Sequence, residues 1–418
     1  MPDATIDKFR DRKAEIGIIG LGYVGLPLAL AFAEAGFQVV GFDVDRKKIA
    51  QLREGHSYIT SIPNRSFQKI HPTSTLEDLH HCLALIVCVP TPLTENREPD
   101  LTYVRKAATL INKLMRDGAH VRLVSLESTT YPGTTEEIFL PLILDGVTDK
   151  VGKNLFVVYS PEREDPGNKN FSLKNTPKII GGVTPTCREV GIALYEHVCK
   201  LVPVESVRTA EMVKIFENTY RAVNIALVNE LKMLCFRLNI NIWEVIKAAA
   251  TKPFGFQPFW PGPGLGGPCI PVNPFYLTWL ARQVDMQVKF IELADEVNSA
   301  MPKFVVERVT KALNSRTLPL RGSSILVVGV AYKADVADTR ESPASKIIRL
   351  LKEEGAVVDY HDSLVPEFEN VRSVPLSRVP EYQMVLLITV HSDFDISSLA
   401  NASLVVDTRG VLPTAFQA

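Results

Sequence analysis

Three glycines, Gly20, Gly22 and Gly25, constrain the fold of this chain more than any other feature. An apolar run at 15–20 leads into them, and a helical pattern at 26–35 follows. In such a strand–turn–helix the first glycine allows the tight turn, the second lets a pyrophosphate approach the backbone, and the third permits close helix–strand packing. The pattern predicts a parallel α/β unit that binds a dinucleotide. The alternative is a purely structural glycine turn.

Asp43 supports the dinucleotide interpretation. It ends the next apolar run, 23 positions after Gly20 (43 − 20), where a carboxylate can accept hydrogen bonds from ribose hydroxyls. Its negative charge would repel a 2′-phosphate, so we expect NAD rather than NADP. The backbone around Tyr23 and Val24 opens the helix, and its N–H groups are expected to bind the phosphates.

Strand-like runs alternate with helical stretches at both ends of the chain, which predicts parallel sheets covered by helices. These runs lie at 37–43, 83–89, 121–126, 155–159, 356–362, 384–390 and 403–407. Between the two ends, helical spacing without Gly or Pro at 209–237 predicts a long helix, followed by helices at 243–250 and from 274 to about 297. The expected fold is therefore two Rossmann-like, doubly wound α/β domains joined by a long central helix. The central helix is either a spacer or a dimer surface.

The length of 418 residues suggests about two to three domains. We expect them at 1–205, 206–310 and 311–418. With 46% hydrophobic and 22% charged residues the chain is an ordinary globular one, and its formal net charge of −1 gives no support for nucleic acid as a partner.

The sequence also bears on location and metals. No apolar run reaches the roughly 20 residues of a membrane helix, and the N-terminus lacks a signal-peptide pattern, so no membrane partner is expected. Six scattered cysteines form no CxxC pair and no metal-ligand cluster. Reduced thiols in a cytoplasm fit this usage, and we expect no metal.

The segment 252–274, KPFGFQPFWPGPGLGGPCIPVNP, is too rich in Pro and Gly for a regular element. It is also too apolar for a solvated linker, so we expect a packed loop that lines a site. Cys269 lies just before a helix whose first turn contains Pro274. A thiol near a helix N-terminus is activated, so Cys269 is a candidate nucleophile. The alternative is a small buried residue in a tight loop.

Other candidates carry weaker signals. Lys214 and Asn218 are four residues apart and share one helix face, although an ion pair of Lys214 with Glu211 would also explain the pattern. Thr130 and Glu162 follow strands, at the edge where open sheets bind ligands. Each alone is typical of a turn or cap residue.

Lys333 and Arg340 follow the first strand of the C-terminal unit. Paired basic residues there suit a phosphate or a carboxylate. A loop salt bridge with Asp335 or Asp338 is the alternative.

Taken together, the motifs resemble the UDP-glucose/GDP-mannose dehydrogenase family over nearly the whole chain. The matching segments are IGIIGLGYVGLPLA, VPTP, ESTTYPGTT, YSPEREDPGN, EMVKIFENTYRAVNIALVNE, PGPGLGGPCIPVNPFYLTW and VAYKADVADTRESPA. SPEREDPGN and KPFGFQPFWPGPGLGG look most like the branch that oxidises UDP-N-acetylhexosamines such as UDP-N-acetylglucosamine. The resemblance implies an N-terminal NAD domain, a C-terminal UDP domain and a dimer built on the central helix.

The resemblance also implies the reaction. A primary alcohol at C6 of the sugar becomes a carboxylate while two NAD are reduced. Cys269 would trap the aldehyde as a thiohemiacetal, with Lys214 and Asn218 stabilising the oxyanion and Thr130 and Glu162 orienting a water. Further implied cofactor contacts are Pro90, Thr91, Thr130 and Arg340. Implied substrate contacts are Glu162, Arg163, Lys214, Asn218, Phe259, Gly266 and Lys333.

Two positions beside Cys269 depart from the family pattern, Pro268 and Asn273. The family branch usually has His and Asp there, and the aspartate is thought to help activate the hydrolytic water. Asn and Asp cap helices about equally well, but an amide is no general base at neutral pH. We therefore expect thiohemiacetal formation to survive and thioester hydrolysis to be slow. Pro268 removes one backbone N–H and stiffens the chain.

Three interpretations stay open. The first is a complete four-electron dehydrogenase in which another group replaces the aspartate. The second is altered chemistry, either a two-electron oxidation or an epimerisation that retains NAD. The third is a weakly catalytic nucleotide-sugar binder.

Overall fold

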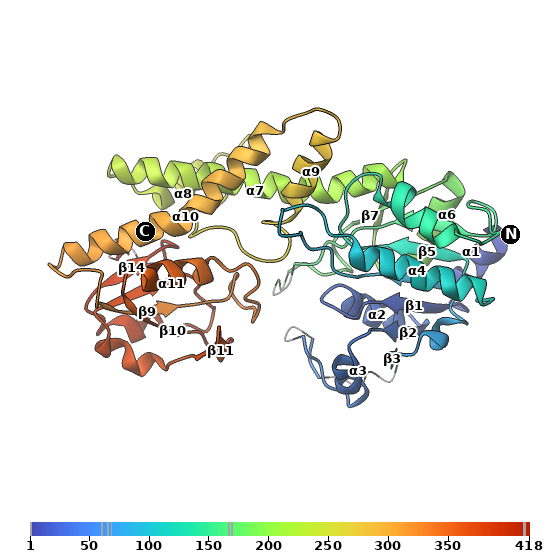
Figure 1. Ribbon diagram of the computed structural model, residues 1–418, viewed down its shortest axis with the longest axis horizontal. Helices are drawn as coiled ribbons and strands as arrows, with labels where there is room; N and C mark the ends of the chain where they lie inside the picture. Colours follow the sequence, from blue (N-terminus) through green and yellow to red (C-terminus); the bar gives the residue numbers. More distant parts are fainter. Residues whose placement is uncertain are drawn as a thin grey trace. The chain divides into compact units, whose positions relative to one another are not determined.

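The computed structural model describes residues 2–59, 62–64, 67, 69–165, 168, 170–412 and 415–418 (Figure 1). The chain forms two compact units. Unit 1 comprises Met1–Glu217 and Phe275–Leu280, and unit 2 comprises Asn218–Pro274 and Ala281–Ala418.

Unit 1 is built on an eight-stranded sheet. Its order is β3-β2-β1-β4-β5-β6-β7-β8, parallel except for the β6–β7 pair. The strands are β1 (Glu15–Ile19), β2 (Gln38–Phe42), β3 (Ile70–Thr73), β4 (Ala84–Val87), β5 (Leu123–Leu126), β6 (Phe156–Tyr159), β7 (Lys178–Gly182) and β8 (Leu201–Pro203). The order 3-2-1-4-5-6 is that of a doubly wound dinucleotide fold, whose switch point lies between β1 and β4.

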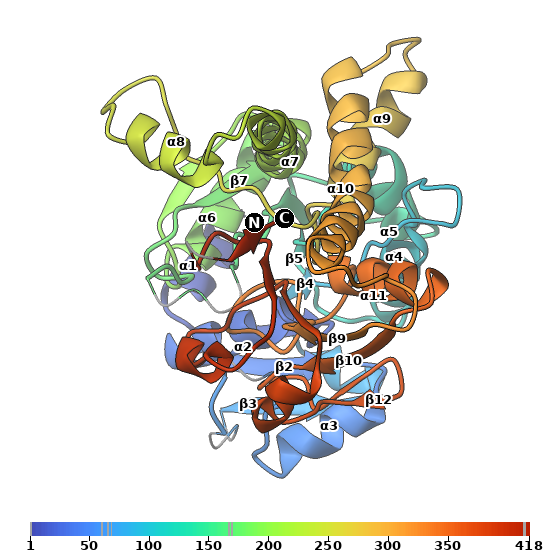
Figure 2. The same ribbon diagram turned by 90° about the vertical axis from the view of Figure 1, so that its left-hand side faces the viewer.

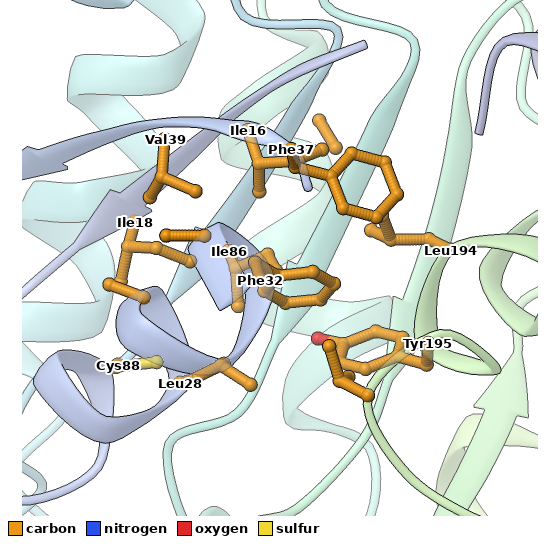
Figure 3. Packing of buried hydrophobic residues seen from close by; sticks show 14 of the residues in the cluster. Ile16, Ile18, Leu28, Phe32, Phe37, Val39, Ile86, Cys88, Leu194 and Tyr195 are labelled. Carbon is orange, nitrogen blue, oxygen red and sulfur yellow. The ribbon is translucent and has the colours of Figure 1, made fainter. Parts of the chain in front are cut away.

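Helices cover both faces of this sheet. They are α1 (Pro2–Arg10), α2 (Gly25–Glu34), α3 (Arg46–Arg53), α4 (Thr102–Arg116), α5 (Leu140–Leu144) and α6 (Pro185–Tyr195). Figure 3 shows the core under α2 and α6, where Phe32 and Tyr195 pack beside Ile16 and Ile18 of β1. Consecutive residues of the central strands β1, β4, β5 and β6 are buried, because both faces of the sheet are covered, and this explains the continuous apolar runs of the sequence.

Unit 2 contains a parallel sheet with the order β10-β9-β13-β14-β15. The strands are β9 (Ser324–Val328), β10 (Val357–His361), β13 (Met384–Leu387), β14 (Val405–Asp407) and β15 (Phe416–Gln417), with a separate hairpin of β11 (Glu367–Phe368) and β12 (Val371–Arg372). Two helices, α10 (Lys289–Asn314) and α11 (Pro343–Glu353), lie side by side and bury Val309 and Ile347 against β9 (Figure 2).

The expected fold class is confirmed: two Rossmann-like units are linked by the long helix α7 (Val207–Arg237), which is followed by α8 (Ile242–Ala249). The prediction of one continuous helix from 274 to about 297 is wrong. The chain forms α9 (Asn273–Arg282), breaks at Asp285, whose φ is +54°, and continues as α10. No helix in the part of the chain that the structure describes is long and apolar enough to span a membrane.

Candidate functional site

The glycine loop after β1 shows three distinct constraints. Gly20 has φ +95°, and a Cβ there would lie 2.7 Å from the carbonyl oxygen of Cys88. A Cβ on Gly25 would lie 1.9 Å from the oxygen of Gly20, whereas one on Gly22 would meet nothing within 4 Å. Gly20 and Gly25 are therefore needed by the fold, and Gly22 faces open space of the kind a pyrophosphate fills.

The start of α2 suits a phosphate. Val24 is its N-cap and makes no side-chain cap, so no side chain covers the first turn. Backbone N–H groups at a helix start carry positive potential and bind phosphate oxygens. The loop that includes Tyr23 and Val24 therefore fits the pyrophosphate of NAD.

Asp43 lies at the end of β2, as expected for a ribose-binding acid. Its Oδ2 accepts the N–H of Leu21 over 2.9 Å, and its Oδ1 accepts the N–H of Asp45 over 2.9 Å. These bonds fix the carboxylate against the glycine loop. Lys48 Nζ lies 3.7 Å from Oδ2.

Pro90 and Thr91 follow β4, the strand next to β1. The Thr91 carbonyl accepts the hydroxyl of Tyr276 over 2.5 Å. This contact fixes the backbone after β4, at the switch point of the sheet. Cofactor contact by Pro90 and Thr91 stays a prediction.

Glu162 and Lys214 form a buried pair in unit 1, with side chains 10% and 7% exposed. Lys214 Nζ donates to Glu162 Oε1 over 2.6 Å and to the Glu162 carbonyl over 2.8 Å, while the Glu164 N–H donates to Oε2 over 2.7 Å. Burial alone would raise the pKa of Glu162, but the lysine charge and these hydrogen bonds outweigh burial and lower it. The site thus holds an ionised carboxylate.

Glu211 is not the partner of Lys214. Its carboxylate accepts the N–H groups of Gly133 and Thr135 over 2.7 and 2.8 Å and the Thr135 hydroxyl over 2.6 Å. Glu211 therefore ties α7 to the loop that follows Thr130. The alternative ion pair considered from the sequence does not form.

Thr130 is fully buried after β5, and its Oγ1 has no hydrogen-bond partner among the residues that the structure describes. A buried hydroxyl without a partner costs free energy unless something else satisfies it. Its own backbone N–H faces the Tyr159 hydroxyl at 3.4 Å. The hydroxyl is thus available to a substrate or a water.

The Arg163 side chain is held by contacts within unit 1. It donates to the carbonyl of Pro177 over 2.6 Å and forms an ion pair with Glu217. The motif residues Pro166 and Gly167 lie outside the described residues. Substrate contact by Arg163 stays a prediction.

In unit 2, Cys269 begins the turn that leads into α9. Its carbonyl accepts the N–H groups of Val272 and Asn273 over 3.2 and 2.9 Å. Asn273 is buried, and its Oδ1 accepts the Nδ2–H of Asn218 over 2.6 Å. Asn273 therefore contacts the backbone of Cys269 and the side chain of Asn218. Catalytic roles for these three residues stay predictions.

The glycines before Cys269 are pressed against the loop after β9. A Cβ on Gly266 would lie 2.8 Å from the Tyr332 Cβ, and one on Gly267 would lie 2.8 Å from the Tyr332 ring. The Gly267 N–H donates to the Arg340 carbonyl over 3.0 Å. The cysteine loop and the 332–340 loop therefore form one packed assembly inside unit 2.

That loop carries Lys333 and Arg340. Arg340 donates through Nε and Nη2 to the Asp338 carboxylate over 3.0 and 2.5 Å, the salt bridge considered from the sequence. A ligand role for either basic residue stays a prediction.

The Pro/Gly segment is packed only in its second half. Phe259 packs against Tyr220, Trp260 stacks on Trp243 with ring centroids 6.2 Å apart, and the Gly262 N–H donates to Asn229 Oδ1 over 2.9 Å. In contrast, residues 251–258 are exposed. The expectation of a packed loop is wrong for that first half.

Sequence reasoning missed a second buried ion pair, Lys178 with Glu127, at 2.5 Å. Glu127 ends the apolar run at 121–126, and Lys178 opens the run KIIGG. The sequence does show a charged residue next to each of the two apolar runs. It does not show that these residues pair, because they are 51 positions apart.

The fold and these clusters define a class, the NAD-dependent oxidoreductases with a doubly wound nucleotide-binding sheet. Three domain models of one family match the chain: the NAD binding domain at residues 14–199, the central domain at 208–300 and the UDP binding domain at 326–414. The chain belongs to the UDP-glucose/GDP-mannose dehydrogenase family.

Several relatives resemble the whole chain. It is 35% identical to the UDP-N-acetyl-D-glucosamine 6-dehydrogenase of Pseudomonas aeruginosa, covering 91% of both chains. It is 33% identical to the UDP-N-acetyl-D-mannosamine dehydrogenase of Methanocaldococcus jannaschii, covering 95% of this chain and 92% of the relative. The solved UDP-D-ManNAc dehydrogenase of Pyrococcus horikoshii has a TM-score of 0.87 at 31% identity, covering 95% of this chain and 96% of that one.

Proposed function

We propose that this protein oxidises C6 of a UDP-N-acetylhexosamine, with UDP-N-acetylglucosamine as the first candidate, to the uronic acid with two NAD. The observation that carries the proposal is the turn before α9, where the Cys269 carbonyl accepts the N–H of Asn273 and the Asn273 side chain accepts the amide of Asn218, because it brings the backbone of Cys269 close to both amide residues. Each of the two NAD molecules would accept one hydride when bound.

Each residue has a separate role in the proposed reaction. Thr130 and ionised Glu162 hold the water that takes the hydroxyl proton during the first oxidation. The Cys269 sulfur then adds to the aldehyde carbon, and Lys214 and Asn218 donate to the oxygen, which becomes negative. A second hydride leaves the carbon and yields a thioester. Water finally cleaves the carbon–sulfur bond and restores the thiol.

The substrate is the finer part of the proposal. Relatives named for N-acetylglucosamine and N-acetylmannosamine match this chain with nearly equal identity, which supports a UDP-N-acetylhexosamine and makes UDP-N-acetylmannosamine the second candidate. Phe259, Gly266 and Lys333 are proposed to contact the substrate, and Pro90, Thr91 and Arg340 the cofactor.

We further propose a homodimer with NAD-binding, central and UDP-binding domains at 1–205, 206–310 and 311–418. Exposed apolar residues on α7, among them Leu227 and Leu234, support the dimer, as does the exposed, aromatic segment 251–258. None of the six cysteines, all of which the structure describes, forms a disulfide, which fits action in the cytoplasm.

Purified protein tests the substrate assignment. NADH formed per sugar consumed is measured with UDP-N-acetylglucosamine, UDP-N-acetylmannosamine and UDP-glucose separately. About two NADH per sugar with an N-acetylated substrate supports the proposal. Two NADH with UDP-glucose alone reassigns the sugar, and isomerised sugar without NADH indicates epimerisation.

A further inference from the structure

A buried ion pair in unit 1 takes no part in the steps above. The side chains of Lys178, at the start of β7, and Glu127, just after β5, are 2% and 1% exposed. Lys178 Nζ donates to Glu127 Oε2 over 2.5 Å. Moving two charges out of water is costly, and such pairs persist where the geometry satisfies both groups fully.

The pair connects the loops that carry Thr130 and Glu162. Lys178 Nζ also donates over 2.9 Å to the carbonyl of Pro161, the residue directly before Glu162. Glu127 stands three residues before Thr130. Because β5 and β6 are parallel neighbours, both loops emerge at the same edge of the sheet. One ammonium group therefore holds both loops.

Further hydrogen bonds hold the Lys178–Glu127 pair in place. Glu127 Oε1 accepts the Tyr195 hydroxyl over 2.6 Å, and that hydroxyl lies 2.8 Å from Ser125 Oγ. The Tyr195 ring is embedded in the core shown in Figure 3. Ser160 Oγ donates to the Ile179 carbonyl over 2.7 Å, which adds a second attachment between β7 and the segment before Glu162. A buried network with this many hydrogen bonds is rigid.

We propose that Lys178 and Glu127 are positioning residues, which hold the Thr130 and Glu162 loops in the geometry that oxidation requires. Both side chains are shielded from solvent and act through the backbone of these loops. The inference rests on the roles proposed for Thr130 and Glu162.

Lys178→Met removes the donor to the Pro161 carbonyl. A misplacement of about 1 Å at reacting groups costs roughly 100-fold in rate, so we expect the rate of first NADH formation, measured before the steady state, to fall by about that factor. This rate reports the oxidation step, whereas kcat reports the slow thioester hydrolysis. NAD affinity falls much less, because the glycine loop follows β1, three strands away from β6 in the sheet order. Lys178→Arg keeps a donor and retains most of the rate of first NADH formation.

The double variant Lys178→Met/Glu127→Gln separates positioning from stability. It leaves no unpaired buried charge, so its thermal midpoint recovers relative to the single variant. The Pro161 carbonyl still lacks its donor, so the rate of first NADH formation stays low. Lys174→Met, which removes an exposed ion pair with Glu34 in the same unit, is the matched control and keeps the wild-type rate.

The experiment measures the rate of first NADH formation, kcat, KM, the NAD dissociation constant and the thermal midpoint of all four variants. A wild-type rate of first NADH formation in Lys178→Met, or recovery of this rate together with stability in the double variant, overturns the inference. If Lys178→Met fails to fold, the rate of first NADH formation in the double variant decides. A wild-type protein that forms no NADH overturns the proposed function and this inference together; an active wild type beside an active Lys178→Met overturns the inference alone.

Discussion

Asn273 puts an amide where hydrolysis of a thioester on Cys269 calls for a base. Its Oδ1 is taken by Asn218 Nδ2–H over 2.6 Å, and its amide cannot accept a proton at neutral pH. The residue is buried, and its N–H donates to the Cys269 carbonyl in the turn before α9. We therefore expect the amide to affect the proposed hydrolysis and not the fold.

The substitution Asn273→Asp should therefore accelerate thioester hydrolysis. A positioned general base contributes about 100-fold or more, so we expect a comparable rise in the rate of the second half-reaction. Rapid-quench mass spectrometry of the Cys269 adduct measures this rate. Asn298→Asp, which alters a second buried Asn–Asn hydrogen bond in unit 2, is the control and should leave the rate unchanged. Equal hydrolysis in Asn273→Asp and wild type would refute the assignment.

Lys232 predicts a pH dependence of stability. Burial lowers its pKa from 10.5 to about 7, with Arg409 and Arg308 lowering it further and Asp407 opposing them. Between about pH 7 and 10.5 the unfolded chain binds a proton that the folded chain lacks, so this lysine makes the free energy of unfolding rise with pH. Below about pH 7 Lys232 is protonated in the folded protein as well, so the full free-energy cost of burying its charge is present and no longer changes with pH.

Lys232→Met removes that rise, which amounts to roughly 1.4 kcal/mol per pH unit at most. Urea unfolding at pH 7 and pH 9.5 measures the difference. Lys346→Met is the matched control, because Lys346 also donates to a backbone carbonyl but is exposed. If the free energy of unfolding rises equally in Lys232→Met and in the wild type between pH 7 and pH 9.5, Lys232 does not cause the pH dependence.

At the scale of elements, the glycine loop separates cofactor binding from folding. Gly22→Ala places a methyl group in open space, so the thermal midpoint of the protein without NAD should stay unchanged. The methyl group would occupy the place of the pyrophosphate, so NAD affinity should fall at least about tenfold. Gly25→Ala, with its Cβ at 1.9 Å from the Gly20 oxygen, should lower the midpoint itself. Thermal melts with and without NAD distinguish the two. An unchanged NAD-induced shift in Gly22→Ala would contradict the role given to Gly22.

The strands and helices show what local pattern predicts well and what it does not. Strongly apolar strands such as β4 and long periodic helices such as α7 were foreseen within a few residues. β3 was missed because its sequence, IHPT, contains a proline and two polar residues in four positions. The break between α9 and α10 was missed because Asp285 adopts a left-handed conformation, which no periodicity indicates.

The candidate site was predictable in its residues but not in its contacts. Lys214 and Glu162 were both selected from the sequence. Their ion pair was not predicted, because it depends on how α7 packs beside the end of β6. Lys178 and Glu127 lie far apart in sequence and become neighbours only because β7 extends the sheet beyond β6. Motifs preserve residue types at reacting positions, whereas supporting pairs become visible only in the fold.

At the scale of the whole molecule, the proposed dimer predicts sensitivity to charge on α7. Leu227, Leu231 and Leu234 are 54%, 40% and 50% exposed, one helical turn or so apart. Leu227→Asp/Leu231→Asp should give a monomer by light scattering. Ile396→Asp, an exposed apolar position off α7, should leave the dimer intact. A dimer that survives both substitutions would remove α7 from the interface.

The most direct test of the central claim combines NADH counting with intact mass on Cys269. Protein is mixed with NAD and UDP-N-acetylglucosamine, and both quantities are followed through the first turnover and beyond. We expect two NADH per sugar, a covalent sugar adduct on Cys269 that builds up while the thioester waits for water, and no adduct in Cys269→Ser. Full turnover with no adduct in the wild type, or equal turnover in Cys269→Ser, would contradict covalent oxidation through this thiol.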